Sequence, residues 1–79
     1  MTDHLPDDSY DAFVVDVIRE TDNAGRLHTH VELTLVAGEY KGRVLQVATD
    51  DSIGTFEELV GLPATLTVAG GTPSVRIDR

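Results

Sequence analysis

Three side chains with metal-binding chemistry recur at every second position in the segment His28-x-His30-x-Glu32. Alternate residues of a β-strand point to the same side, so a strand here would place two imidazoles and one carboxylate together. That donor set is able to bind zinc. The sequence offers no evident fourth ligand, and an outward-facing polar strand has the same pattern. We therefore predict no metal and no other cofactor, with a metal-binding module as an alternative.

A second cluster of side chains suited to ligand binding is the run Gly38-Glu39-Tyr40-Lys41-Gly42-Arg43. It gathers one aromatic ring and two cations, and proteins that bind single strands use such rings to stack on bases and such cations to contact phosphates. A charged hairpin tip without a ligand has the same composition. The run therefore indicates either a nucleic-acid contact or a turn whose charges keep it in water.

No arrangement typical of an enzyme active site is evident in the sequence. Its carboxylate pairs, Asp7-Asp8, Asp50-Asp51 and Glu57-Glu58, are neighbours along the chain, and such neighbours rarely converge on one substrate atom. No Ser-His-Asp arrangement is supported, and no glycine-rich phosphate loop precedes a helix. We therefore predict that the chain is not an enzyme.

Length and composition indicate one small domain. A chain of 79 residues buries only about 60% of its unfolded surface, so its core is small. The absence of cysteine excludes a disulfide framework and a thiolate metal site, which favours a cytoplasmic location. The acidic N-terminus does not read as a signal peptide, and no apolar run approaches the ~18 residues of a membrane span.

The chain is strongly acidic, with 14 Asp and Glu against six Lys and Arg and a formal net charge of −8. Lys41 is its one lysine, which is typical of a salt-loving host, although high-GC codon usage has the same effect. An acidic surface repels nucleic acid at low salt, but at about 1 M salt the Debye length falls to about 3 Å. The same surface would attract a basic protein partner.

The secondary-structure elements that carry these residues are predicted from the spacing of apolar side chains. Residues 1–9 are polar and acidic, which predicts a flexible N-terminal tail ahead of a single domain over residues 10–79. Tyr10–Glu20 predicts a first strand with apolar residues on both faces. Arg26–Ala37 alternates strictly and predicts a half-buried antiparallel strand. A glycine-flanked hairpin then leads to a third strand over Arg43–Thr49.

A short helix is predicted after the third strand. Asp50-Asp51-Ser52 supplies candidate N-caps, and Gly61 is a suitable residue to end the helix. Two more strands follow, over Ala64–Ala69 and Ser74–Asp78. The predicted apolar stripe of the helix consists of Ile53, Phe56, Leu59 and Val60.

Three strands, one helix and two strands in this order are typical of the OB-fold, a small five-stranded Greek-key barrel. We therefore predict an all-β chain with one short helix, in which Phe56 and Leu59 plug the bottom of an OB-fold-like barrel. An SH3-like barrel and a small open α+β sheet are the alternatives. OB-folds often bind oligonucleotides or oligosaccharides between two loops, which here contain Asn23-Ala24-Gly25-Arg26 and Gly70-Gly71-Thr72.

The run ELTLVAGEYKGRVLQV resembles the strand-turn-strand of phage and prophage single-stranded-DNA-binding proteins, in which a hairpin of the type G-E-Y-x-G-R follows an apolar strand. The later segment EELVGLPATLTV is similar to the segment that introduces their fourth strand. The resemblance extends from residue 32 to residue 68, about half of the chain. The resemblance implies an OB-fold and single-strand binding, with Tyr40, Lys41 and Arg43 near the contact surface.

The sequence therefore predicts a module that binds single-stranded nucleic acid along the face of the second and third strands. The alternative is an acidic protein-interaction or assembly module of a larger complex, which binds a basic partner and has no nucleic-acid contact. The predicted nucleic-acid contacts are Arg26, His28, His30, Tyr40, Lys41, Arg43 and Gln46.

Overall fold

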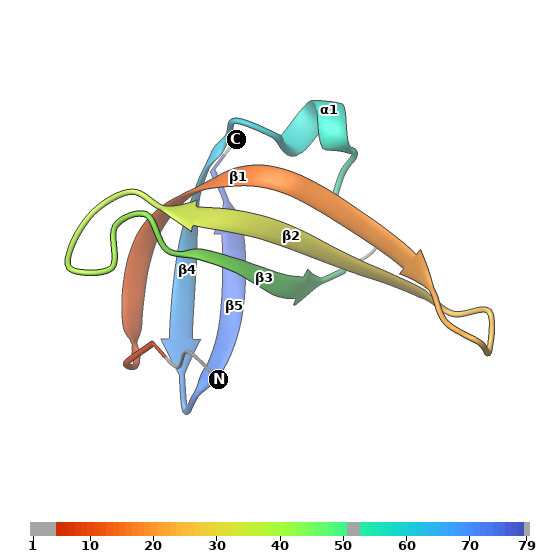
Figure 1. The fold of residues 1–79 in the computed structure, drawn as a ribbon, viewed down its shortest axis with the longest axis horizontal. Helices are drawn as coiled ribbons and strands as arrows, with labels where there is room; N and C mark the ends of the chain where they lie inside the picture. The colour runs from red at the N-terminus through yellow and green to blue at the C-terminus, as the bar shows by residue number, and fades with distance from the viewer. Residues whose placement is uncertain (1–4, 51–52, 79) are drawn as a thin grey trace.

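The computed structural model describes residues 5–50 and 53–78. It contains five strands and one short helix, in the order predicted from the sequence (Figure 1). The elements are β1 (Asp8–Thr21), β2 (Leu27–Leu35), β3 (Val44–Thr49), α1 (Phe56–Leu59), β4 (Pro63–Ala69) and β5 (Thr72–Ile77).

All five strands belong to one antiparallel sheet with the order β3-β2-β1-β4-β5. The long strand β1 lies at its centre and pairs with β4 through its first half and with β2 through its second half. The sheet curves so that the edge strands β3 and β5 approach each other (Figure 1). Within residues 5–50 and 53–78 these edges form no ladder, so the sheet is not closed into a barrel. The mostly-β prediction with one short helix is confirmed, whereas a closed barrel is not observed.

A β-bulge in β1 explains why this strand is apolar on both faces. The pairing register with β2 shifts between Val14 and Asp16, which leaves Val15 as an extra residue. Val14 is buried before the bulge, and Val17 packs against the core after it. Strict alternation along the sequence would place Phe13, Val15 and Val17 on one face, but the extra residue exchanges the two faces of the strand and brings Val17 to the core.

The alternation predicted for β2 is confirmed by the structure. Its inward side chains fill the centre of the core, while His28, His30 and Glu32 lie on the outer face. The alternation would also place Leu27 on the inner face, but its side chain is 45% exposed, because it lies on the β1–β2 hairpin that projects beyond the core (Figure 1). The buried residues of β2 are Thr29, Val31, Leu33 and Leu35.

The helix is shorter than predicted and begins later. Thr55 is the N-cap: its side chain accepts a hydrogen bond from the Glu58 backbone, and the Glu58 carboxylate accepts one from the Thr55 backbone. The predicted caps at Asp50-Asp51-Ser52 are therefore not used by α1, although Asp51 and Ser52 lie outside the described residues. A single turn buries one side chain, so Leu59 is buried while Phe56 is 47% exposed and does not plug the sheet. No described helix has the length and hydropathy that a membrane span requires.

The acidic N-terminal segment joins the fold earlier than predicted. The first strand begins at Asp8, within the residues 1–9 that were assigned to the tail. Leu5 is buried in the core cluster. The carboxylate of Asp7 accepts backbone hydrogen bonds from Gly70 and Gly71, at 2.8 and 3.1 Å, in the β4–β5 turn. The domain therefore includes the chain from Leu5 onward.

Candidate functional site

The predicted nucleic-acid contacts lie along β2 and β3, but they do not form one cluster. The two connections that flank β2 lie at opposite ends of it (Figure 1). His30 on β2 and Gln46 on β3 lie on the outer face between these ends. Arg26 and His28 lie at the β1–β2 end, and Tyr40, Lys41 and Arg43 lie at the β2–β3 end.

At the β1–β2 end, His28 contacts its own hairpin. Its Nε2 lies 2.8 Å from Oδ2 of Asp22, while Oδ1 of Asp22 accepts the backbone N–H groups of Ala24 and Arg26. The hydrogen bond with His28, followed by that from Arg26, lowers the pKa of the Asp22 carboxyl. The described residues contain no group of three His, Asp or Glu that could hold a metal ion. The metal-binding alternative therefore gains no support from the geometry.

Replacing His28 with alanine is expected to raise the pKa of Asp22 towards its ordinary value, because the variant loses the largest interaction that lowers it. A carboxyl with a lowered folded pKa stabilises the fold above its unfolded pKa, and this contribution disappears as the pH falls through the folded pKa. The His28→Ala variant should therefore lose less stability on acidification. The ¹³C shift of the Asp22 carboxyl, followed against pH, gives the midpoint of its titration in the unmodified protein, in His28→Ala and in the control Arg76→Ala. Equal midpoints in these three proteins would show that His28 does not lower the pKa of Asp22.

Between the two ends, the outer face carries carboxylates among the predicted contacts. Glu32 pairs in register with Asp16 on β1 and with Gln46 on β3. The amide of Gln46 donates to Oε2 of Glu32 at 3.5 Å. Two negative side chains, Asp16 and Glu32, therefore lie next to each other where a phosphate backbone would have to lie, and they would repel it.

At the β2–β3 end, Tyr40 is already in contact with other side chains of the chain. The guanidinium of Arg43 lies 5.5 Å from the centroid of the Tyr40 ring. Tyr10 meets the same ring edge-to-face, with centroids 6.1 Å apart and an interplanar angle of 80°. Tyr40 is half-buried and packs against the core. The ring is therefore less free to stack on a base than the sequence predicted.

A cavity of about 430 Å³ opens beside these two rings. The start of β1 supplies Asp8, Tyr10 and Asp11, and the β2–β3 connection supplies Glu39 and Tyr40. A backbone hydrogen bond of 3.0 Å from Val36 to the Asp11 carbonyl holds the two segments together. Sequence reasoning missed the β1 contribution, because no spacing along the chain relates these residues to Tyr40.

Negatively charged side chains surround the Tyr10 phenol in this cavity. Partial burial and then the neighbouring Asp8 carboxylate raise the pKa of the Tyr10 phenol, with further contributions from Tyr40, Asp7 and Glu39. The phenol donates a hydrogen bond to the Pro6 carbonyl. This environment disfavours an additional negative charge and favours a positive one.

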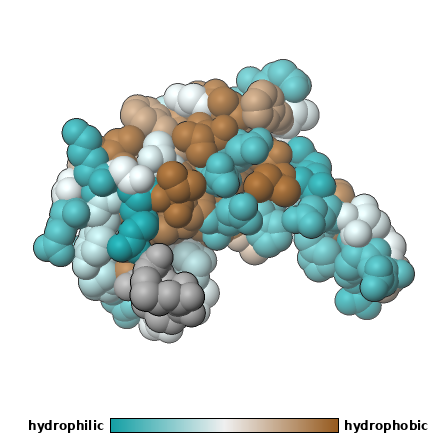
Figure 2. Space-filling view, viewed as in Figure 1, coloured by the Kyte–Doolittle hydropathy of each residue, from teal (hydrophilic) through white to brown (hydrophobic). Residues whose placement is uncertain are grey.

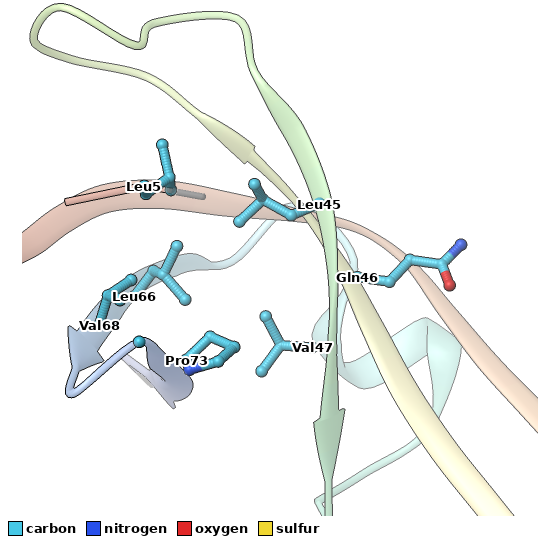
Figure 3. Close-up of a pocket in the computed structure, with 8 residues that line it drawn as sticks. Leu5, Leu45, Gln46, Val47, Leu66, Val68 and Pro73 are labelled. Carbon is cyan, nitrogen blue, oxygen red and sulfur yellow. The ribbon is translucent and has the colours of Figure 1, made fainter. Parts of the chain in front are cut away.

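A second, apolar cavity of about 260 Å³ lies where the sheet is not closed. Figure 3 shows Leu45 and Val47 of β3 pointing into it, while Gln46 points away. Figure 2 shows apolar surface over the middle of the molecule, bordered by hydrophilic residues. The cavity has few polar groups to orient a ligand. Its other lining residues include Leu5, Leu66, Val68 and Pro73.

No protein-family model matches the chain, and no curated protein or solved structure is significantly similar to it.

Proposed function

We propose that this chain is a protein-interaction module that binds a basic partner and performs no catalysis. The observation that carries the proposal is the set of carboxylates around the Tyr10–Tyr40 cavity, Asp8, Asp11 and Glu39. None of the three forms an ion pair with a described cation. The ion pairs seen among the described residues, His28–Asp22 and Arg76–Asp78, lie elsewhere. Together with the net charge of −8, these groups favour association with a positively charged surface.

Binding of single-stranded nucleic acid is the second candidate function. The observation that favours it is the position of Tyr40, Lys41 and Arg43 together on the one connection that joins β2 to β3. The strand order and the approach of β3 to β5 support an OB-fold-like open barrel as the underlying architecture. We rank this candidate second, because the carboxylates on the outer face would repel the phosphates of a nucleic acid.

One titration distinguishes the two candidates. The ¹⁵N-labelled protein is mixed with an alternating lysine–glycine peptide and, separately, with a short oligothymidine. Each mixture is followed by amide shifts at low salt and at about 1 M salt, where the Debye length is about 3 Å. A glutamine–glycine peptide of equal length is the neutral control.

We expect saturable shifts with the lysine peptide at low salt, weaker shifts in high salt, and none with the neutral peptide or oligothymidine. Shifts with oligothymidine along residues 26–47, without shifts from the lysine peptide, would reject the first candidate and establish the second. An absence of shifts with every probe would reject both.

A further inference from the structure

The Tyr10–Tyr40 cavity has the size and the lining of a binding site. Its volume of about 430 Å³ lies within the usual range of ligand pockets, about 300–1,000 Å³. Two tyrosine rings stand edge-to-face at its wall, and the rigid β1 strand supplies one of them. A cavity built partly on a strand keeps its shape better than one formed by loops alone.

The ring of Tyr40 is suited to contact a cation. The face of an aromatic ring is negative, so it attracts ammonium and guanidinium groups within about 6 Å of its centroid. Arg43 already makes such a contact at 5.5 Å. Arg43 is not among the residues that line the cavity, and no described lining residue is a lysine or arginine. Among the described residues, the lining of the cavity therefore carries no lysine or arginine that would compete with a cationic ligand.

The polar groups of the cavity are nearly all hydrogen-bond acceptors. Three lining residues, Asp8, Asp11 and Glu39, carry carboxylates, and those of Asp8 and Glu39 act on the Tyr10 phenol. The Tyr10 hydroxyl donates a hydrogen bond to the Pro6 carbonyl, so the lone pairs of its oxygen remain available to accept hydrogen bonds. The raised pKa of Tyr10 agrees with a negative potential at this position. A ligand that satisfies these groups must be positively charged and rich in N–H donors.

We propose that this cavity binds a cationic side chain, lysine or arginine, from an exposed segment of a basic protein partner. The methylene stem of such a side chain packs on the tyrosine rings, and its charged end reaches the carboxylates. This inference rests on the proposed function and assigns to it a location and a chemical class of ligand.

Two double variants with the same change in charge test the location. Asp8→Asn with Glu39→Gln removes two carboxylates that act on the Tyr10 phenol in the cavity, whereas Asp16→Asn with Glu20→Gln removes two from elsewhere on β1. The probes are the lysine–glycine peptide and an arginine–glycine peptide, and the readouts are the dissociation constant and the amide shifts. We expect the cavity variant to lose affinity about tenfold more than the control variant. In the unmodified protein, shifts should lie on residues 8–11 and 37–40.

The Tyr40 ring is tested separately. Tyr40→Phe keeps the ring and should retain peptide binding, whereas Tyr40→Leu removes it and should weaken peptide binding about tenfold. If the peptides bind but both double variants lose affinity equally, the inference is wrong and the proposed function stands. If neither peptide binds the unmodified protein, the proposed function itself is wrong.

Discussion

Replacing Leu33 with alanine is expected to lower the free energy of unfolding by about 2–5 kcal/mol. Leu33 is fully buried on β2, between Val14 of β1 and Leu45 of β3 in the pairing register. The loss combines the transfer free energy of the side chain with the cavity left behind. A domain of this length has a total stability of about 4–12 kcal/mol, so the variant should lose a large part of it.

Urea unfolding followed by far-UV circular dichroism measures this effect, and Val44→Ala is the matched control. Val44 neighbours the same region of β2 but points outward and is 54% exposed. Its replacement should therefore cost less than about 1 kcal/mol. Equal losses in the two variants would show that the core is not packed around Leu33.

Replacing Gly54 with alanine has the second largest expected effect, about 1–3 kcal/mol. Gly54 has a φ of +141°, which side-chain-bearing residues rarely adopt. A Cβ atom there would lie 3.2 Å from Cγ of the buried Leu59. The Gly54 carbonyl also accepts a hydrogen bond from Arg19 of β1, which restrains the segment that would have to move.

Gly25→Ala is the control for this prediction, because Gly25 has a φ of +79° but open space around its missing side chain. It should cost only the backbone strain, about 1 kcal/mol. Thermal unfolding of Gly54→Ala, Leu59→Ala and their combination then forms a double-mutant cycle. Because the added Cβ at position 54 collides with the Leu59 side chain, the double variant should lose less stability than the sum of the losses in the two single variants. Additivity within about 0.5 kcal/mol would contradict this prediction.

The fold is largely predictable from the sequence, because the spacing of apolar residues in β2, β3 and β4 determines which side faces the core. Three features were not predictable in this way. The bulge at Val15 leaves no mark in a strand whose residues are apolar on both faces. The cap at Thr55 depends on Glu58, but the Asp and Ser residues ahead of it are equally good caps. Sheet closure depends on the distance between β3 and β5, which no local pattern encodes.

The candidate site was predictable only in part. The sequence singled out Tyr40 and Arg43, together with Lys41, as contacts to a nucleic acid, and the structure shows that these two side chains meet each other. Their other neighbours, Tyr10 and Asp11, come from β1, and only the tertiary structure brings them close. The predicted single surface from Arg26 to Gln46 required the ends of β2 to act together, and the length of that strand separates them.

The central position of β1 has a consequence for how the chain folds. The pairs β1–β2, β2–β3 and β4–β5 join segments that are close in sequence, whereas β1–β4 joins Asp8 to Val68. Closing so long a loop costs entropy before any contact compensates for it. The three-stranded meander and the β4–β5 hairpin are therefore able to assemble from local contacts, and their docking along β1 sets the contact order of the whole chain. Since β1 is the one strand shared by both parts, its pairing with β4 determines whether this small domain folds as a single cooperative unit.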